Sequence, residues 1–172
     1  EICYGENIQL SASGNLSSFL WVPAVGLNDP NISNPIASPI NDITYTIYHS
    51  DGICLVKDTV KVIVHSEVPS ISFSTIDNCE NDTVKFLANS GLLTNNTSWN
   101  WSFGSLLQNP EYQFSVGSNS VMLIVENLNN GCQDTLIQNV EIYPLPESSF
   151  IVQEVCFGED IYILNNSSSD VV

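Results

Sequence analysis

The sequence predicts an all-β protein of tandem antiparallel β-sandwich domains, and three observations lead to this fold class. Apolar and polar residues alternate at period two in many short runs, whereas no window keeps an apolar helical face over three turns. Asn and Ser, which weaken helices and favour turns, supply 20 and 23 of the 172 residues. The third observation is an internal repeat, whose length sets the size of each domain.

A unit of about 77 residues repeats along the chain, because a proline, a phenylalanine and a cysteine each recur 77 positions later. Hexapeptides that begin at Cys3, Cys79 and Cys156 also share one pattern, reading CYGENI, CENDTV and CFGEDI. The matches in register indicate duplication of one structural unit. The returning positions are Pro69 as Pro146, Phe73 as Phe150 and Cys79 as Cys156, and Cys54 precedes Cys132 by 78.

The repeat length also divides the chain into domains, because a unit of this size is sufficient for a seven-strand sandwich. Ten residues separate Pro69 from Cys79, but only two precede Cys3. We therefore expect residues 1–66 to be a repeat that lacks its first strand and 67–144 to be a complete repeat. Residues 145–172 are expected to begin a third, truncated repeat, so that the sequence is internal to a longer chain.

In the first repeat, four runs are expected to form strands. The runs at 7–12 and 43–49 alternate apolar and polar residues, as a half-buried strand does. The runs at 19–22 and 59–64 are rich in aromatic or β-branched residues. A proline-rich run at 23–39 is expected to replace a regular edge strand, because proline cannot donate to a β-ladder.

In the second repeat, six strands are expected, with turn residues between them. The breaks fall at Gly104, 109–110, Gly117 and 129–131, where Gly, Pro and Asn favour turns. Short proline-containing linkers precede and follow this repeat. The expected strands cover 70–75, 83–88, 98–103, 112–116, 121–126 and 135–142.

The charge of the chain excludes several classes of partner. Three lysines, no arginine and nineteen acidic residues give a formal net charge of −16. Binding to phosphate backbones or anionic membrane surfaces relies on Lys and Arg, so we expect no nucleic-acid partner. The sequence also contains no apolar run of the roughly 18–20 residues that a membrane helix needs, so no direct membrane insertion is expected.

Four motifs of the second repeat resemble the PKD domain, an immunoglobulin-like sandwich repeat. The resemblance departs at 105–106, where Ser-Leu replaces the usual Asp-Gly. The first repeat is similar to related repeats in giant surface proteins of gliding Bacteroidota. Over the whole chain, the resemblance implies immunoglobulin-like sandwiches at a bacterial cell surface. The motifs are WSFG at 101–104, NPEY at 109–112, VMLIV at 121–125 and GCQDT at 131–135, and in the first repeat WVP at 21–23, GL at 26–27, NP at 34–35 and TYT at 44–46.

Five cysteines with no C-x-x-C motif and only two histidines favour disulfides over a zinc site. Pairing within repeats would join Cys3 to Cys54 and Cys79 to Cys132. In an immunoglobulin-like sandwich, however, the first turn, with Cys79, and the last hairpin, with Cys132, lie at opposite poles. A six-residue strand spans roughly 20 Å, whereas the Cα atoms of a disulfide lie about 4.4–6.8 Å apart. An interdomain Cys3–Cys132 bond is therefore favoured over the two pairings within repeats, which leaves Cys79 and Cys156 for later units.

No motif for catalysis or for phosphate binding is present, so we expect no enzyme and neither catalytic nor cofactor-binding residues. Calcium is the one cofactor considered, because carboxylates recur at the expected interdomain turn. Glu6, Asp82 and Asp160 are weak candidates for metal ligands, and solvated turn residues are the alternative.

Two further site predictions concern sugars. Trp21 and Trp101 occupy matched positions and are expected in the core, whereas Trp99 is expected to be half exposed and is a candidate for glycan contact. The resemblance also implies O-glycosylation of the Asp-Ser/Thr-apolar type found in Bacteroidota. The threonines that would carry it are Thr59, Thr83 and Thr135, and the alternative is that Asp-Thr opens a strand.

Together these features predict a non-enzymatic segment of a long, repetitive adhesin at the bacterial cell surface, of the gliding or attachment type. It would act as a stiff, extended scaffold, with the neighbouring repeats of the same chain as its first partners. Surface glycans or other surface proteins are further candidate partners. The alternative is a non-catalytic spacer or a carbohydrate-binding array in a secreted hydrolase.

Overall fold

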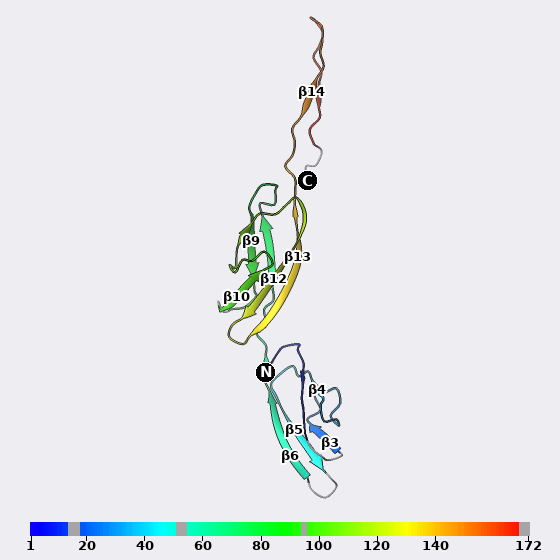
Figure 1. Ribbon diagram of the computed structural model, residues 1–172, viewed down its shortest axis with the longest axis vertical. Helices are drawn as coiled ribbons and strands as arrows, with labels where there is room; N and C mark the ends of the chain where they lie inside the picture. Colours follow the sequence, from blue (N-terminus) through cyan, green and yellow to red (C-terminus); the bar gives the residue numbers. More distant parts are fainter. Residues whose placement is uncertain (14–17, 51–54, 94–95, 169–172) are drawn as a thin grey trace.

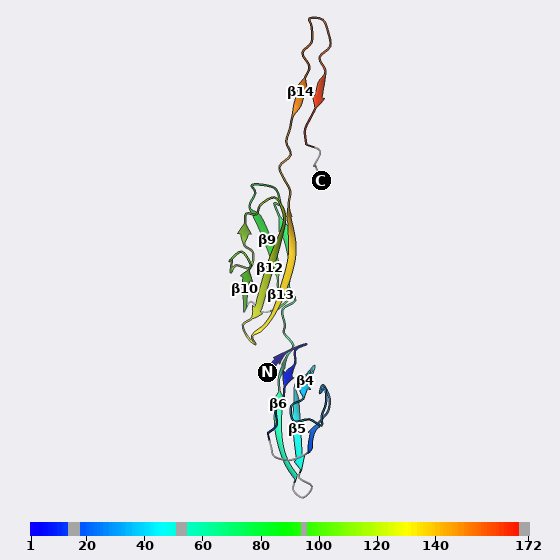
Figure 2. The same ribbon diagram turned by 45° about the vertical axis from the view of Figure 1, so that its right-hand side comes forward.

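The computed structural model describes residues 1–13, 18–50, 55–93 and 96–168, which form β-strands, turns and loops with no α-helix. The molecule is long and narrow, with the first repeat at one end, the second in the middle and residues 145–168 at the other end (Figure 1). The same end-to-end order is visible after rotation (Figure 2). In the described segments no helix is long and apolar enough to cross a membrane. Because the regular elements of the described residues are all β-strands, the predicted all-β class is confirmed.

The second repeat contains two three-stranded antiparallel sheets that enclose one core. One sheet has the order β11-β9-β8 and the other has the order β10-β12-β13. The core draws on both sheets, because apolar residues alternate with exposed ones along their central strands. The strands are β8 (Ser72–Ile76), β9 (Val84–Asn89), β10 (Thr97–Trp101), β11 (Glu111–Tyr112), β12 (Gly117–Asn127) and β13 (Cys132–Ile142).

Trp101 lies at the centre of this core and is 1% exposed. Its ring centroid lies 5.2 Å from that of Phe73 and 4.8 Å from that of Phe86. Its indole N–H donates to the carbonyl oxygen of Leu107 at 2.9 Å, so the buried polar atom is satisfied. Facing side chains from β8, β9 and β10 thus meet in one aromatic cluster.

The first repeat has a second core, which is separate from that of the second repeat. Its larger sheet has the order β3-β5-β6, and two short pairs, β2 with β4 and β1 with β7, complete it. The β1–β7 pair is parallel, whereas the other three pairings, β2 with β4, β3 with β5 and β5 with β6, are antiparallel. The strands are β1 (Ile2–Cys3), β2 (Ile8–Gln9), β3 (Ser18–Val22), β4 (Ile36–Ala37), β5 (Ile43–Ser50), β6 (Leu55–Val62) and β7 (Val64–His65).

The observed strands differ in length from the predicted ones. β12 and β13 each extend over 11 residues, because they pair from Gly117 opposite Ile142 to Asn127 opposite Cys132, through polar residues as well as apolar ones. In contrast, the run predicted at 7–12 contributes a strand of only two residues, β2. The proline-rich run at 23–39, which was expected to replace a regular edge strand, contains the short strand β4, and this strand pairs with β2.

Residues 145–168 form an extended hairpin with little packing of its own. β14 (Phe150–Val152) pairs in antiparallel fashion with β15 (Ile163–Asn165), and every residue of both strands is exposed. The register repeats that of β8 with β9 when 77 is subtracted from each number, because Phe150 lies opposite Asn165 as Phe73 lies opposite Ala88. We refer to residues 145–168 as the C-terminal hairpin.

Candidate functional site at the joint between the repeats

A disulfide joins the two repeats. Cys3 and Cys132 are bonded, with their Cα atoms 5.7 Å apart and a sequence separation of 129. β1 places Cys3 beside His65, at the exit of the first repeat, because the two strands run in parallel there. Cys132 opens β13 in the hairpin that begins the last strand of the second repeat. This is the interdomain pairing that the sequence favoured.

Two asparagines of the same hairpin hold the linker between the repeats. The side-chain amides of Asn127 and Asn130 donate to the carbonyl oxygen of Glu67 at 3.0 and 3.1 Å. Asn127 is fully buried, and its side-chain oxygen accepts from the N–H of Asn129 at 3.1 Å. The Asn130 side-chain oxygen accepts from the N–H of Cys132 at 3.0 Å. The joint therefore combines one covalent bond with two hydrogen bonds to one carbonyl.

The sequence predicts a turn at 129–131, but this prediction does not include the contact between the hairpin and the linker. The available signal was the run of asparagines before Cys132, since Asn both accepts from backbone N–H groups in turns and donates through its amide. Gly131 follows with a φ of 73°, a left-handed conformation that glycine adopts without a steric cost. The turn residues are thus also the residues that contact the first repeat.

Carboxylates fix the exit strand of the first repeat. Asp42 accepts from the N–H of Val64 at 2.9 Å and pairs with the Lys61 ammonium at 3.2 Å. These two interactions hold the pKa of Asp42 below its usual value. Glu1 lies 3.0 Å from the His65 ring, and this hydrogen bond together with the charge of His65 lowers the pKa of the Glu1 carboxyl. Both contacts lie beside β7, which leads into the joint.

Cys79 occupies, in the second repeat, the position that Cys3 occupies in the first. Cys79 forms a parallel bridge with Tyr143, as Cys3 does with His65. The residue after each cysteine then donates its N–H to the carbonyl oxygen of the bridge partner. Glu80 donates to Tyr143 at 2.7 Å, and Tyr4 donates to His65 at 2.9 Å. Unlike Cys3, Cys79 is an exposed free thiol. The two thiol positions therefore have the same backbone environment but different covalent states.

This geometry also excludes the alternative pairings of the cysteines described. Cys79 lies beside Tyr143, whereas Cys132 lies at the other end of β13, so a strand of 11 residues and roughly 35 Å separates them. A Cys3–Cys54 bond is likewise excluded by the bond from Cys3 to Cys132, and Cys54 itself lies outside the described residues. Cys156 is exposed and free, in the turn of the C-terminal hairpin.

The candidate calcium ligands take part in turns. Glu6 accepts from the N–H of Cys3 at 3.0 Å, and its own N–H donates to the Cys3 carbonyl. The N–H of Asp82 donates to the Cys79 carbonyl at 3.1 Å, and Asp160 is exposed in the C-terminal hairpin. Within the described segments no three His, Cys, Asp or Glu side chains gather where they could hold a metal ion. Of the three acids, Glu6 is the one whose carboxylate accepts a turn hydrogen bond among the described residues, whereas Asp82 takes part through its backbone.

The prediction that Trp99 is half exposed is wrong. Trp99 is 8% exposed and belongs to the same core cluster as Trp101, since both face inward from β10. It lies opposite Val125 of the neighbouring strand, so the two side chains are side by side on the inner face of this sheet. Glycan contact through Trp99 would require this core to open. Trp21, 3% exposed, and Trp101 are buried, as the sequence predicted.

Thr59, Thr83 and Thr135 are all exposed. The side chains of Asp58 and Asp134 accept from the N–H of Thr59 and Thr135, each at 2.7 Å. Both threonines lie inside strands, in β6 and β13, whereas Thr83 directly precedes β9. The hydroxyl groups of the three threonines are thus on the surface of the molecule.

No protein-family model matches the chain, and no match was found among curated proteins.

Proposed function

We propose that the chain is a non-enzymatic, stiff and extended segment of a long, repetitive adhesin at the bacterial cell surface. The observation that carries this proposal is the Cys3–Cys132 disulfide between two repeats that follow one another end to end. A covalent bond across a joint restricts bending more than a short linker does. The role proposed for the segment is to set a distance and a direction between whatever lies at its two ends.

The joint supports this role through its three separate contacts. The disulfide fixes the hairpin to β1, and the two asparagine amides fix the same hairpin to Glu67. Attachment at several points opposes rotation about the linker, whereas one point would leave a pivot. The linker also carries Pro69, whose ring limits backbone freedom.

We propose further that the joint is repeated along the parent chain. Cys79 has the backbone environment of Cys3. The C-terminal hairpin comes after the second repeat in the chain, just as the second repeat comes after the first. We assign to Cys79 a disulfide with a hairpin cysteine of a following repeat. The two facing sheets of the second repeat and the matched tryptophans support immunoglobulin-like, PKD-like sandwiches as the repeating unit.

The acidic surface supports an extracellular array in which neighbouring copies stay apart. A net charge of −16 over 172 residues gives mutual repulsion between chains, which favours solubility. The disulfide is compatible with an oxidising compartment. Labelling of intact, unpermeabilised source cells with an antibody against this segment tests the location. Signal that appears only after the cells are opened would reject a surface role.

Small-angle X-ray scattering tests the scaffold role. The chain with Cys3→Ser and Cys132→Ser is expected to show a broader distribution of interatomic distances than the parent, because the joint loses its covalent bond. Cys79→Ser is the matched control, since it removes an exposed free thiol at the other pole. Identical scattering of the double variant and the parent would show that the disulfide does not set the shape.

The exposed Asp-Thr positions support O-glycosylation of the protein made by its source cells. We propose that at least one of Thr59, Thr83 and Thr135 carries a sugar there. Mass spectrometry of proteolytic peptides of the protein made by those cells is expected to show an added sugar mass on a peptide that contains one of these three threonines. Peptides that cover all three threonines and carry only their unmodified masses would remove the proposal.

A further inference from the structure

The hairpin at the joint contains an Asn-Gly pair, Asn130-Gly131, and this is the one Asn-Gly pair in the sequence. An asparagine side chain can react with the backbone nitrogen of the residue that follows it. Glycine hinders this reaction least, because it has no Cβ and lets other atoms approach its backbone closely. The pair is therefore the position in the chain where the local sequence most favours spontaneous loss of a side-chain amide.

The reaction is a ring closure followed by hydrolysis. The Gly131 nitrogen bonds to the amide carbon (Cγ) of Asn130, and the side-chain nitrogen leaves as ammonia, taking the proton from the Gly131 N–H. The product is a cyclic imide, which water opens at one of its two carbonyl carbons. Opening at the side-chain carbonyl gives aspartate, and opening at the backbone carbonyl gives isoaspartate. Water is the one co-reactant, and neither route returns the amide.

In the structure, hydrogen bonds hold both reacting groups. The Gly131 N–H donates to the carbonyl oxygen of Asn127 at 2.8 Å, so its nitrogen is not free to attack. The Asn130 amide donates to the Glu67 carbonyl at 3.1 Å, and its oxygen accepts from the N–H of Cys132 at 3.0 Å. The amide carbon becomes tetrahedral during ring closure, which displaces its oxygen and nitrogen from both partners. The reaction must therefore break these three hydrogen bonds.

Part of this restraint comes from outside the hairpin. Glu67 belongs to the linker between the repeats, 63 positions before Asn130. Cys132, in the same hairpin, is fully buried and is bonded to Cys3 of the first repeat. The disulfide therefore keeps the hairpin beside the linker and opposes separation of the Asn130 amide from the Glu67 carbonyl. The rate of ring closure should thus depend on whether the joint is closed.

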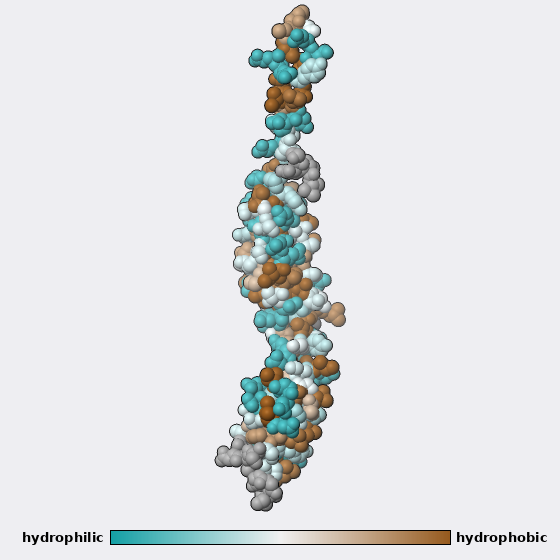
Figure 3. Space-filling model, turned by 90° about the vertical axis from the view of Figure 1, so that its right-hand side faces the viewer, coloured by the Kyte–Doolittle hydropathy of each residue, from teal (hydrophilic) through white to brown (hydrophobic). Residues whose placement is uncertain are grey.

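Solvent reaches the pair without any opening of the fold. Asn130 is partly exposed and Gly131 is exposed. Figure 3 shows hydrophilic side chains at the surface of the narrow region between the two repeats. Water can therefore open the imide once it has formed. The step that the structure restrains is the ring closure, and not the supply of water.

The products cannot replace the amide at the joint. Neither carboxylate has an N–H to donate, so the Glu67 carbonyl would lose this hydrogen bond and face a negative charge. Isoaspartate also adds one carbon to the backbone directly before Gly131, which changes the turn that leads to Cys132. Of the two asparagine amides that hold the Glu67 carbonyl, only that of Asn127 would remain. Because ammonia is lost, a joint modified in this way does not regain its original contacts.

We propose that Asn130 is a modification site whose reaction is controlled by the joint. While the Cys3–Cys132 bond and the contact with Glu67 persist, the amide is kept. When that bond is absent and the joint opens, Asn130 is converted to aspartate or isoaspartate, and the joint then stays weakened. The modification thus keeps a chemical record that the joint has opened. This control depends on the joint alone, whether or not the parent protein is an adhesin.

Incubation at mildly alkaline pH, followed by mass spectrometry of proteolytic peptides, tests this control. The closed chain retains Cys3 and Cys132, whereas the opened chain carries Cys3→Ser and Cys132→Ser. Conversion of Asn130 is expected to be about tenfold faster in the opened chain, because the lost restraint lowers the barrier to ring closure. A reductant added to the closed chain is expected to accelerate conversion in the same way. Both chains carry three further substitutions that exclude other disulfides, Cys54→Ser, Cys79→Ser and Cys156→Ser.

Asn119-Ser120 provides an internal reference in the same digest, because the Asn119 amide is held within the second repeat. It donates to the carbonyl oxygens of Ser115 and Gly117 at 2.8 and 2.9 Å. Opening of the joint is expected to leave the conversion of Asn119 unchanged. An equal rise at both asparagines would show that the general fold of the second repeat protects Asn130, and would overturn the proposal. Equal rates of Asn130 conversion in the closed and opened chains would overturn it as well.

The effect of the product is tested with Asn130→Asp in the closed chain. Hydrogen exchange at residues 64–68 is expected to become about fivefold faster, because the linker loses one of its two amide donors. Asn129→Asp is the matched control, since it adds the same charge at the neighbouring residue. The Asn129 side-chain oxygen accepts from the Asn96 amide at 2.7 Å, and a carboxylate can also accept that bond. Equal exchange in the two variants would show that added charge, and not the lost donor, loosens the joint, and would contradict the effect assigned to the product.

Discussion

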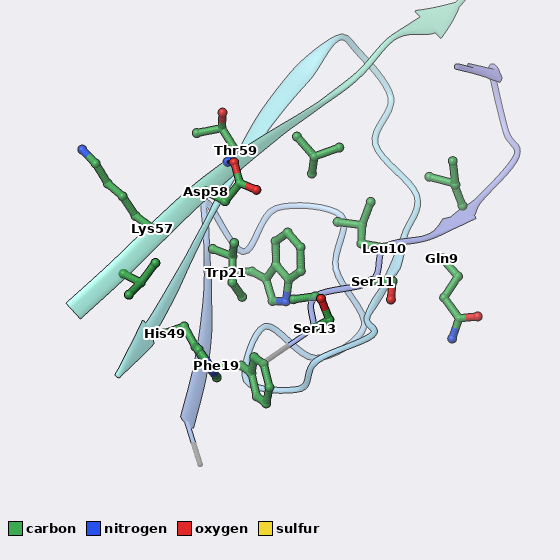
Figure 4. A pocket seen from close by; sticks show the side chains of 15 residues that line it. Gln9, Leu10, Ser11, Ser13, Phe19, Trp21, His49, Lys57, Asp58 and Thr59 are labelled. Atoms are coloured by element: carbon green, nitrogen blue, oxygen red, sulfur yellow. Dashed lines mark hydrogen bonds between the residues drawn. The ribbon is translucent and has the colours of Figure 1, made fainter. Parts of the chain in front are cut away.

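The two repeats share a core tryptophan but differ in the strand that covers it. Trp21 and Trp101 each donate an indole N–H to a backbone carbonyl at 2.9 Å. In the second repeat β8 brings Phe73 against the Trp101 ring, whereas in the first repeat a cavity of about 450 Å³ borders Trp21 (Figure 4). Matched positions of the two repeats therefore direct the same kind of side chain inward, whereas the residues packed against that side chain differ between the two cores.

The largest expected effect on stability comes from removing the Phe73 ring that covers the tryptophan of the second repeat. Phe73→Ala removes a buried ring between Phe86 and Trp101 and should lower the free energy of unfolding of the second repeat by about 3–4 kcal/mol. Urea unfolding followed by tryptophan fluorescence measures this loss. Ser74→Ala, on the exposed face of the same strand, is the control and should change stability by less than about 0.5 kcal/mol. A loss below about 1 kcal/mol for Phe73→Ala would mean that β8 adds little to this core.

A smaller effect is expected at the joint, where the hairpin of the second repeat meets the linker from the first. Asn127→Ala should cost about 1–3 kcal/mol, because the fully buried Asn127 amide loses its hydrogen bonds to the Glu67 carbonyl and to the N–H of Asn129. Asn130, which is partly exposed, should cost about 0.5–1 kcal/mol when it is replaced by Ala. Hydrogen exchange at residues 64–68 would report the loosened linker. If the two variants lost the same free energy of unfolding, the burial of Asn127 would not explain why its hydrogen bonds matter more.

The smallest expected effect is on how the stability of each repeat depends on pH. Asp42 in the first repeat has a lowered pKa, so its contribution is present at neutral pH and is lost as pH falls below its usual value of 3.8. Lys85 in the second repeat has a pKa raised by Asp77, so its contribution is present below 10.5 and is lost as pH rises through the raised value. Both pairs are exposed, so each effect is small.

Urea unfolding at a series of pH values measures these two contributions. Asp42→Asn should flatten the acid side of the profile of the first repeat and leave the alkaline side unchanged. Lys85→Gln should do the reverse for the second repeat. An unchanged acid side in Asp42→Asn would mean that the titration of Asp42 contributes nothing to the pH dependence, and therefore that folding does not lower its pKa.

The period-two pattern located the strands of the second repeat because their two faces meet different surroundings. It underestimated β12 and β13, since their pairing continues through Ser118, Asn119 and Ser120, where backbone hydrogen bonds do not depend on apolar side chains. It overestimated the strand at 7–12, of which only Ile8 and Gln9 pair as a strand, with β4. Pairing with a neighbouring strand is not a property of the local sequence.

The joint was predictable in part. The opposite poles of a sandwich already separated Cys79 from Cys132, and the repeat then left Cys3 as the partner for Cys132. The asparagine contacts to Glu67 were not predictable, because they depend on how two repeats are placed relative to each other. Trp99 shows a related limit: its direction was predictable from Trp101, but the residues that bury it come from other strands.

The position of the disulfide determines how the molecule would respond to tension. A pull on the first residue reaches Cys3 almost at once, crosses to Cys132 and leaves along β13 at Tyr143. The residues between the two cysteines, which are 129 positions apart in the sequence, lie outside this covalent path. Their release would lengthen the chain by roughly 400 Å, at about 3.3 Å per extended residue. With the bond intact, the end-to-end length under load is therefore nearly independent of whether the first repeat is folded.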